Sequence, residues 1–520
     1  MVVDVFIHEI KGGSMTIKKI NELVDKLHEM GVKQSQLAWV QYTAGYDFGL
    51  EESYKDMMTF MKDKEHFKIV EDHRALELSD LDKRRVDIVY KSFKPYHLSD
   101  EVNALALDIQ KKTNELSQIL NTFRFKLDNK SVTSVDLAQI LSNDENRENR
   151  KQAYLAKNQI NQPMVDGGFL ELVEMRKKMA KLNGFDNFVA YKLDHEELSP
   201  DIFENWIEEV HEMLPEMEKM RSEYAMKYLG EENLMPWDEA YVENQLAPSL
   251  SKNVDMTNYY YHLSRLFKSF GFDLNDYNIT YDLFPRANKS EWGYNFPIDT
   301  QKDSRILANV KNQFHEFGVL LHETGHGVHS FLNDKDEKIL NMGISGIVTE
   351  GIANLFGAQM LDPLFFKEFF EDDFEQVQAE FESIKKWKKM NALRAVSRIF
   401  FDQRFYTTDN KNLDDVYKMY WSVQKEVLNV EPGDYEPPWA FLIHHTTHPI
   451  YLHNYFMGDV TCEMLIQTFN KSNGTSKISE KPLEFGKFLY EDVVKPSGQY
   501  TYGELFERIS KEKFSLKYMK

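Results

Sequence analysis

The chain is poor in cysteine, in long apolar runs and in positive charge. Cys462 is the one cysteine among 520 residues, so an internal disulfide and a zinc site built from cysteine thiolates are both excluded. A single cysteine fits a reducing compartment, and we expect a cytoplasmic protein. No apolar run approaches the roughly 20 residues needed to cross a bilayer, which predicts that the chain does not span a membrane.

The charge balance narrows the range of partners. The net charge of −21 disfavours nucleic acids and anionic lipid surfaces. The start of the chain, Met1–Met15, lacks the cationic end and the uninterrupted apolar centre of a signal peptide. Met15 follows Gly12–Ser14, so residues 1–14 are interpreted as an appended or alternative start.

Most of the sequence has the spacing of amphipathic helices. Apolar residues recur at three- and four-residue steps in Ile17–Met30, Val102–Leu120 and Ile202–Leu229. The same spacing from Phe374 to Ile399 predicts one long helix with a single buried stripe. The expected fold class is therefore mainly α.

Strand patterns are rare, and two of them precede a helical segment with unusual chemistry. Glu291–Ile298 carries Trp292, Tyr294 and Phe296 at every second position, and Arg305–Val310 is a short apolar run. Together they predict a small antiparallel pair. The helical period resumes in the segment 311–332, so part of a sheet is expected beside that helix.

This helix contains the sequence His-Glu-Thr-Gly-His at positions 322–326. Residues four apart lie one turn above each other on a helix, so His322 and His326 can direct their imidazoles at one metal ion. Zinc acidifies a coordinated water, and Glu323 is placed to take the proton from that water. The alternative is a helix with two satisfied surface histidines, but the apolar sequence around the motif argues against it. Gly325 costs helix stability, which predicts a close approach by another segment.

A catalytic zinc site needs a third protein ligand. The metzincin pattern is excluded, because His329 and Leu332 stand where that class requires glycine and histidine. Glu350 lies 24 residues after His326 and is the one acidic residue in the mainly apolar segment 339–360. A lone carboxylate in such a segment favours a cation as partner, so Glu350 is the predicted third ligand. A structural salt bridge or helix cap is the alternative role.

These motifs resemble those of the thimet oligopeptidase and oligoendopeptidase F family of zinc peptidases. The segment 322–329 is similar to the family's His-Glu-x-Gly-His-x-x-His signature, and Glu350 has a matching position. Met235–Tyr241 is similar to its Pro-Trp-Asp-x-x-Tyr segment, and Arg176–Gly184 to one of its helix ends. Leu37–Tyr42 has a weaker similarity to peptidyl-dipeptidase A, the angiotensin-converting enzyme group.

The resemblance implies a zincin-type helical fold of two lobes with a deep central channel. It also implies one zinc ion per chain and unstructured oligopeptides as substrates. Residues 15–175 are expected to form an N-terminal helical lobe, and residues 176–520 the zinc peptidase region. The resembled enzymes stabilise the tetrahedral oxyanion with a histidine and one or two tyrosines from a C-terminal segment.

In this sequence that segment is 444–455, which is rich in histidine. Tyr455 is the first choice for the oxyanion donor, with Tyr451 as the substitute and His448 or His445 as the partner. Peptidyl-dipeptidase A has a lysine two residues before its histidine, whereas this chain has other residues before both histidines. That difference argues against a strict dipeptidyl-carboxypeptidase.

The predicted activity is that of a zinc metallopeptidase of the oligopeptidase, metalloendopeptidase type. The alternatives are an inactive peptide-binding relative and a zinc hydrolase of another amide. The sequence leaves open the cleavage preference, the choice between endopeptidase and dipeptidyl-carboxypeptidase action, and the oligomeric state.

Overall fold

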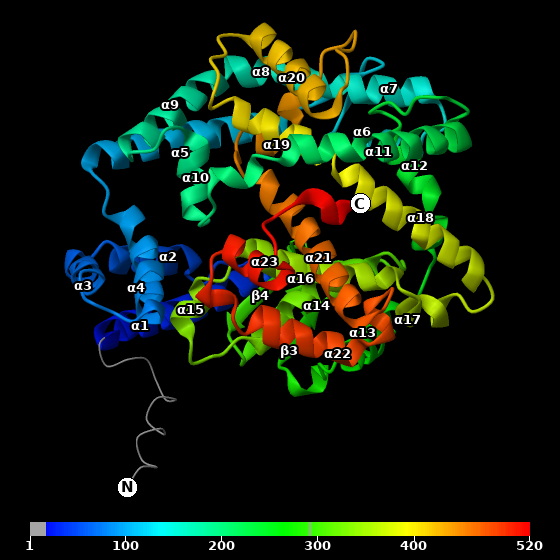
Figure 1. The fold of residues 1–520 in the computed structure, drawn as a ribbon. Helices are drawn as coiled ribbons and strands as arrows, with labels where there is room; N and C mark the ends of the chain where they lie inside the picture. The colour runs from blue at the N-terminus through cyan, green and yellow to red at the C-terminus, as the bar shows by residue number, and fades with distance from the viewer. Residues whose placement is uncertain (1–16, 291–292) are drawn as a thin grey trace. The chain divides into compact units, whose positions relative to one another are not determined.

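The computed structural model describes residues 17–290 and 293–520. The predicted start at residues 1–14 and Trp292 of the predicted strand lie outside the described residues. The chain forms two compact units, each assembled from separate stretches of sequence (Figure 1). The first comprises residues 1–98, 253–366 and 464–513, and the second comprises residues 99–252, 367–463 and 514–520. The expected division of the chain before Arg176 falls within a helix and stays a prediction.

The first unit contains most of the described strands. Its helices and strands are α1 (Lys18–Ala44), α2 (Leu50–Met61), α3 (Lys64–Arg74), α4 (Asp80–Phe93), α13 (Tyr259–Ser269), β3 (Ile279–Asp282), β4 (Tyr294–Asp299), β5 (Asp303–Leu307), α14 (Glu316–Leu332), α15 (Lys338–Met342), α16 (Gly346–Ala358), α17 (Pro363–Phe366), α22 (Pro482–Phe488) and α23 (Tyr502–Ser510).

The second unit is helical apart from one short hairpin. Its elements are α5 (Asp100–Thr122), β1 (Phe125–Leu127), β2 (Lys130–Val132), α6 (Ser134–Asn143), α7 (Arg147–Ala156), α8 (Asn161–Asp166), α9 (Phe169–Leu182), α10 (Phe188–His195), α11 (Trp206–Leu229), α12 (Glu239–Leu246), α18 (Phe374–Ala392), α19 (Ala395–Arg404) and α20 (Leu413–Leu428). Helix α21 (Leu452–Asn473) begins in the second unit and ends in the first. The mainly α fold class is confirmed.

The sheet of the first unit has the strand order β3-β5-β4. Strands β4 and β5 pair antiparallel, which confirms the predicted pair, although β5 ends at Leu307 rather than Val310. Strand β3 was not predicted; it pairs parallel with β5, so the sheet is mixed rather than purely antiparallel. β4 is therefore an outer strand of the sheet.

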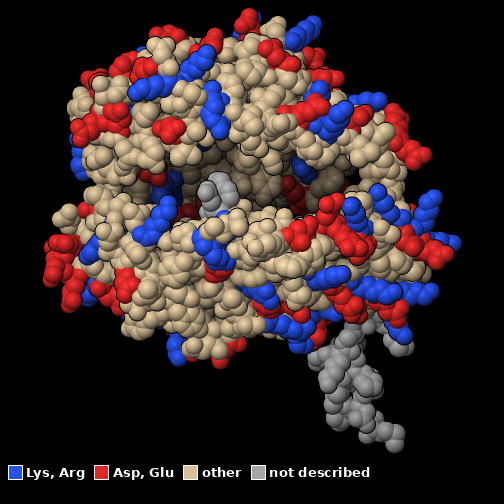
Figure 2. Space-filling model, turned by 180° about the vertical axis from the view of Figure 1, so that it is seen from behind, with Lys and Arg blue, Asp and Glu red and all other residues tan. Residues whose placement is uncertain are grey.

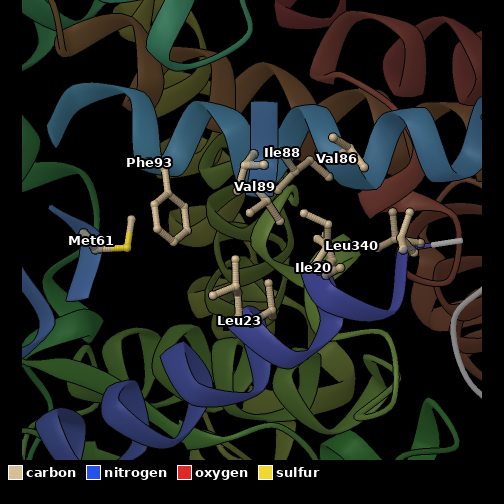
Figure 3. Close-up of a cluster of buried hydrophobic side chains, with 12 residues drawn as sticks. Ile20, Leu23, Met61, Val86, Ile88, Val89, Phe93 and Leu340 are labelled. Atoms are coloured by element: carbon tan, nitrogen blue, oxygen red, sulfur yellow. The ribbon is translucent and has the colours of Figure 1, made fainter. Parts of the chain in front are cut away.

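A buried apolar cluster fixes α1 in the first unit (Figure 3). Ile20 and Leu23 of α1 lie among Val89 and Phe93 of α4 and Leu340 of α15. The spacing of the apolar residues explains why this stretch is helical, since one stripe is removed from water. Helix α1 also packs against β4, so the cluster supports the outer strand of the sheet.

The segment from Phe374 is two helices, and the prediction of one long helix is wrong. Helix α18 ends at Ala392 and α19 begins at Ala395. Around the junction, the N–H groups of Leu393 and Arg394 bond to carbonyls three residues back, the pattern of a tightened final turn. Arg394, at the break, also forms an ion pair with Glu239 of α12 at 3.2 Å. The periodicity of apolar residues carries no information on such a tertiary contact.

No helix in the described residues has the length and apolar character needed to span a membrane. Acidic and basic side chains lie interspersed over the face shown in Figure 2. Acidic residues outnumber basic ones in the sequence, but on this face the two kinds of side chain are not separated from each other.

Candidate metal centre and active-site residues

Helix α14 carries both histidines of the predicted metal site. Most of the helix is buried, while the side chains of His322 and His326 retain 23% and 21% exposure. Their rings lie edge to face with centroids 4.8 Å apart. Glu316 begins the helix and accepts hydrogen bonds from the backbone N–H groups of Lys311 and Gln313 at 2.6 and 2.9 Å. The pair therefore stands on a well-anchored helix, one turn apart as predicted.

Two glycines allow α16 to approach α14 closely. A Cβ added at Gly325 would lie 3.1 Å from the Phe356 ring and 3.3 Å from the Cα of Ala353. A Cβ added at Gly357 would lie 3.2 Å from the Gly318 carbonyl oxygen. The expectation that Gly325 permits a close approach is confirmed, and the approaching segment is the helix that carries Glu350.

The approach of α16 brings Glu350 to the two histidines. Its carboxylate oxygens lie 3.6 Å from His322 Nε2 and 3.6 Å from His326 Nε2. Helix α16 begins at Gly346, and the Ser345 side chain just before it accepts a hydrogen bond from the Ile347 N–H at 3.2 Å. Among the described residues, His322, His326 and Glu350 form the one cluster of potential metal ligands, with donor atoms within 4.8 Å of one another.

The donor set and its spacing fit a zinc ion. Ligand atoms at about 2.1 Å from a tetrahedral zinc lie about 3.4 Å from one another, close to the 3.6 Å separations between the Glu350 carboxylate and the imidazoles. Burial and the neighbouring His326 lower the pKa of His322 to about 4, so its imidazole is neutral near pH 7. The Asn354 side chain, one turn after Glu350, hydrogen-bonds to His322 and orients it.

Glu323 faces the outer strand of the sheet. Its side chain accepts a hydrogen bond from the backbone N–H of Asn295 on β4. Burial raises the pKa of Glu323 to about 7. A carboxyl group with this pKa can accept a proton and later return it near neutral pH. The contact with Asn295 was not predicted, although the strand pattern just before the motif indicated that a sheet lies nearby.

A cavity of about 440 Å³ adjoins the cluster within the first unit. It is lined by α1, β4, α14 and the start of α16, and its wall includes His326, His329 and Thr349. His329 is buried, and burial with the nearby His326 lowers its pKa to about 4. It belongs to the cavity wall rather than to the ligand cluster.

The predicted oxyanion segment lies in the second unit. His448 is exposed, and Tyr451 and Tyr455 have 43% and 47% exposure. The two tyrosine rings pack edge to face with centroids 5.3 Å apart, and His444 stacks on Tyr451 at 5.9 Å. His444 had no predicted role, and in the structure its ring packs against that of Tyr451.

His445 differs from its neighbours in the segment. It is 4% exposed, and its Nδ1 lies 2.9 Å from the Trp439 carbonyl oxygen. Burial lowers its pKa to about 4, so the ring is neutral. Its ring also packs edge to face against Phe401. Of the two histidines considered as oxyanion partners, the structure places His448 in solvent and His445 in the core.

The aspartate of the Pro-Trp-Asp segment forms buried ion pairs. The Asp238 carboxylate is fully buried, and it accepts hydrogen bonds from Arg150 at 2.9 Å and from Arg147 at 2.8 Å. Both arginines belong to α7 of the same unit. The motif therefore ties α7 to the start of α12, and its conformation follows from these buried charges.

Comparison with known proteins agrees with these features. The sequence profile of peptidase family M3 matches residues 140–271 and 276–517. No curated protein sequence matches the chain. Among solved structures, the chain is similar to the M32 carboxypeptidase from Deinococcus radiodurans R1, with a TM-score of 0.64, 15% sequence identity and 97% of each chain covered. That likeness shows the fold, and the match across most of the sequence shows that the chain belongs to peptidase family M3, a family of metallopeptidases.

Proposed function

We propose that the protein is a zinc-dependent oligopeptidase in which His322, His326 and Glu350 hold one zinc ion. The observation that carries the proposal is the convergence of two imidazoles and one carboxylate at zinc-like spacing. A bound zinc ion supplies Lewis-acid chemistry, since it acidifies water and polarises the carbonyl of the bond to be cleaved. The remaining steps are assigned to side chains of the protein.

Glu323 is the proposed general base. Its carboxylate accepts a proton from the attacking water and then delivers it to the nitrogen of the departing amine. Burial places its pKa at about 7, which suits transfer in both directions near neutrality. The hydrogen bond from the Asn295 N–H orients the carboxylate before the substrate arrives.

Tyr455 and His448 are the proposed oxyanion donors, with Tyr451 as the substitute for Tyr455. A phenol O–H or an imidazole N–H donates to the oxygen on which negative charge develops. The exposure of these three side chains supports the assignment, because a donor must reach the substrate. The burial of His445 favours His448 in this pair.

Unstructured oligopeptides are the proposed substrates. Strand β4 is an outer strand, and its Asn295 N–H already points towards Glu323. A peptide in extended conformation can add to such an edge by main-chain hydrogen bonds, which brings its backbone beside the general base. The charge of −21 disfavours nucleic acids and anionic membranes as partners, and the one buried cysteine suits a reducing cytoplasm.

A mixed library of synthetic peptides tests the proposal. The protein is incubated with the library with and without a chelator, and the products are identified by mass spectrometry. We expect cleavage that stops with the chelator and returns when zinc is added. The termini of the products distinguish internal cleavage from removal of terminal residues. Cleavage that persists after complete removal of the metal would rule out the proposed chemistry.

A further inference from the structure

The short turn that carries His448 is bonded to a buried arginine on its N-terminal side. Arg176 of α9 donates to the Thr446 carbonyl oxygen at 2.7 Å and to the Thr447 carbonyl oxygen at 3.4 Å. The arginine is 3% exposed, and it also donates to the Tyr406 hydroxyl at 3.1 Å. One guanidinium thus fixes the two peptide groups immediately before His448.

A buried carboxyl group bonds to the C-terminal side of the same turn. Asp402 of α19 is 1% exposed, and its Oδ2 accepts a hydrogen bond from the Ile450 N–H at 2.5 Å. Ile450 has a φ of 53°, a left-handed conformation that is strained for a β-branched residue. Such a conformation persists when surrounding contacts enforce it, and the bond to Asp402 is one of these contacts.

The two anchors leave a tip of two residues between them. Thr447 and Ile450 are held by Arg176 and Asp402, while the intervening His448 is exposed. Tyr451 follows immediately, and α21 starts at Leu452. The His448 Nδ1 lies 2.9 Å from the Thr447 hydroxyl, and the His448 backbone N–H donates to the Ile443 carbonyl oxygen at 3.0 Å. Both contacts are with residues of the turn or just before it, so the direction of the exposed ring depends on the position of the turn's backbone.

We propose that Arg176 and Asp402 are positioning residues that hold His448 and Tyr451 in the orientation needed for catalysis. The inference rests on the oxyanion role proposed for this segment and adds two residues that do not contact the substrate. Misplacement of a reacting group by about 1 Å costs up to about 10²-fold in rate, so a clamp of the backbone can control turnover from a distance.

Asp402 can accept the hydrogen bond from the Ile450 N–H whether its carboxyl group is neutral or ionised. Burial raises the pKa of Asp402 to about 8, against the opposing effects of the Ile450 N–H and the charges of Arg176 and Lys192. The neutral carboxyl group therefore predominates near pH 7, and its oxygen still accepts the Ile450 N–H. An asparagine side chain offers a similar neutral acceptor in nearly the same shape.

The test compares D402A with D402N in the full-length, zinc-loaded protein. D402A removes the acceptor, and we expect kcat to fall about tenfold to 10²-fold with KM changed less than about threefold. D402N keeps an acceptor oxygen and is expected to recover most of kcat. The matched control is S397A on α19, which removes a buried hydroxyl bonded to Gln424 at 3.1 Å. It should lower the melting temperature and leave kcat unchanged.

A second pair of variants separates positioning from general damage to the fold. Glycine adopts positive φ without steric cost, so in an I450G background the loss caused by D402A should shrink to less than about threefold. An equal loss in both backgrounds would show that Asp402 does not act through the Ile450 backbone. Should D402A fail to fold, R176K provides the test, because lysine cannot bridge two carbonyls in the fixed geometry of a guanidinium.

The outcomes distinguish the clamp from the function on which it rests. If H448A and Y455F slow the reaction but D402A and R176K do not, the clamp is wrong and the oxyanion assignment stands. If H448A, Y451F and Y455F all keep the wild-type kcat, the oxyanion assignment fails and the catalytic role of the clamp fails with it.

Discussion

The metal cluster and the 444–455 segment are built in opposite ways. Both histidines of the cluster stand on one regular helix, and Glu350 stands on a second helix that packs against it. The 444–455 segment is a turn with a strained residue, Ile450, followed by the start of α21. Helix geometry fixes the first region, whereas bonds to distant residues fix the second.

The difference lies in the sequence separation of the contacts. Ligands four residues apart align through the helical repeat alone, so the cluster needs one tertiary contact, that of α16 with α14. The turn needs Arg176, which is 270 residues away from Thr446, and Asp402, which is 48 residues away from Ile450. The following substitutions test whether the cluster and the turn fail in the different ways that these constructions imply.

The largest effect is expected for His322→Ala. Loss of one imidazole leaves His326 and Glu350 as a two-ligand set, and we expect the zinc content to fall from about one per chain to nearly none. Activity should fall about 10⁴-fold or more, since water acidification and carbonyl polarisation are lost together. Elemental analysis and peptide cleavage measure the two effects. His315→Ala, just before the same helix, is the control and should keep its zinc; full zinc in H322A would contradict the ligand assignment.

Glu323→Gln is expected to separate metal binding from catalysis. The amide has the size of the carboxyl group but cannot take a proton, so kcat should fall about 10²- to 10⁴-fold while the zinc content is retained. Glu316→Gln on the same helix is the matched control. It weakens a structural bond to the Lys311 or Gln313 N–H, so stability should fall with little change in kcat. Wild-type turnover by E323Q would exclude Glu323 as the base.

In the 444–455 segment, Tyr455→Phe removes only a hydroxyl group. Loss of one oxyanion donor typically costs about 10²- to 10³-fold in kcat, with a smaller change in KM. Zinc content and melting temperature should hardly change, because Tyr455 is 47% exposed and lies in the other unit. Tyr451→Phe is the companion variant that decides between the two tyrosines. If neither slows the reaction tenfold, the segment is not the oxyanion site.

The features that could be predicted from the sequence depend on the helical period and on single residues that are unusual for their surroundings. The helical period placed His322 and His326 together, and an isolated acid in an apolar segment indicated Glu350. Gly325 indicated the contact between the helices before the partner was known. The roles of these residues in catalysis remain predictions, but their convergence in space is an observation.

The features that the sequence did not predict depend on tertiary contacts. Strand β3 has four residues and pairs with β5, and its short pattern carries too little alternation to be recognised alone. The break between α18 and α19 lies inside a continuous apolar stripe. His445 and His448 are alike in sequence context, and their different burial follows from how the turn packs on α19. Neither periodicity nor composition contains that information.

The smallest effect is expected where the two helices of the cluster touch. In Gly357→Ala, the new Cβ would lie 3.2 Å from the Gly318 carbonyl oxygen and 3.3 Å from the His322 Cβ. The helices must separate by a few tenths of an ångström, and overpacking typically costs about 1–3 kcal/mol, against about 1 kcal/mol gained in helix propensity. Glu350 moves away from the histidines with α16, so zinc binding should weaken about threefold to tenfold.

Gly346→Ala is the control for this substitution because it lies on the same helix with no atom within 4 Å of the added Cβ. It should keep its zinc affinity and be as stable as the wild type or slightly more so. Zinc titration and thermal unfolding of both variants measure the difference. Equal zinc affinity in G357A and G346A would mean that the contact between α14 and α16 accommodates the added methyl group without moving Glu350. Weaker binding in G357A alone would show that the spacing of the two helices, and not only the identity of the three ligands, determines the affinity of the site.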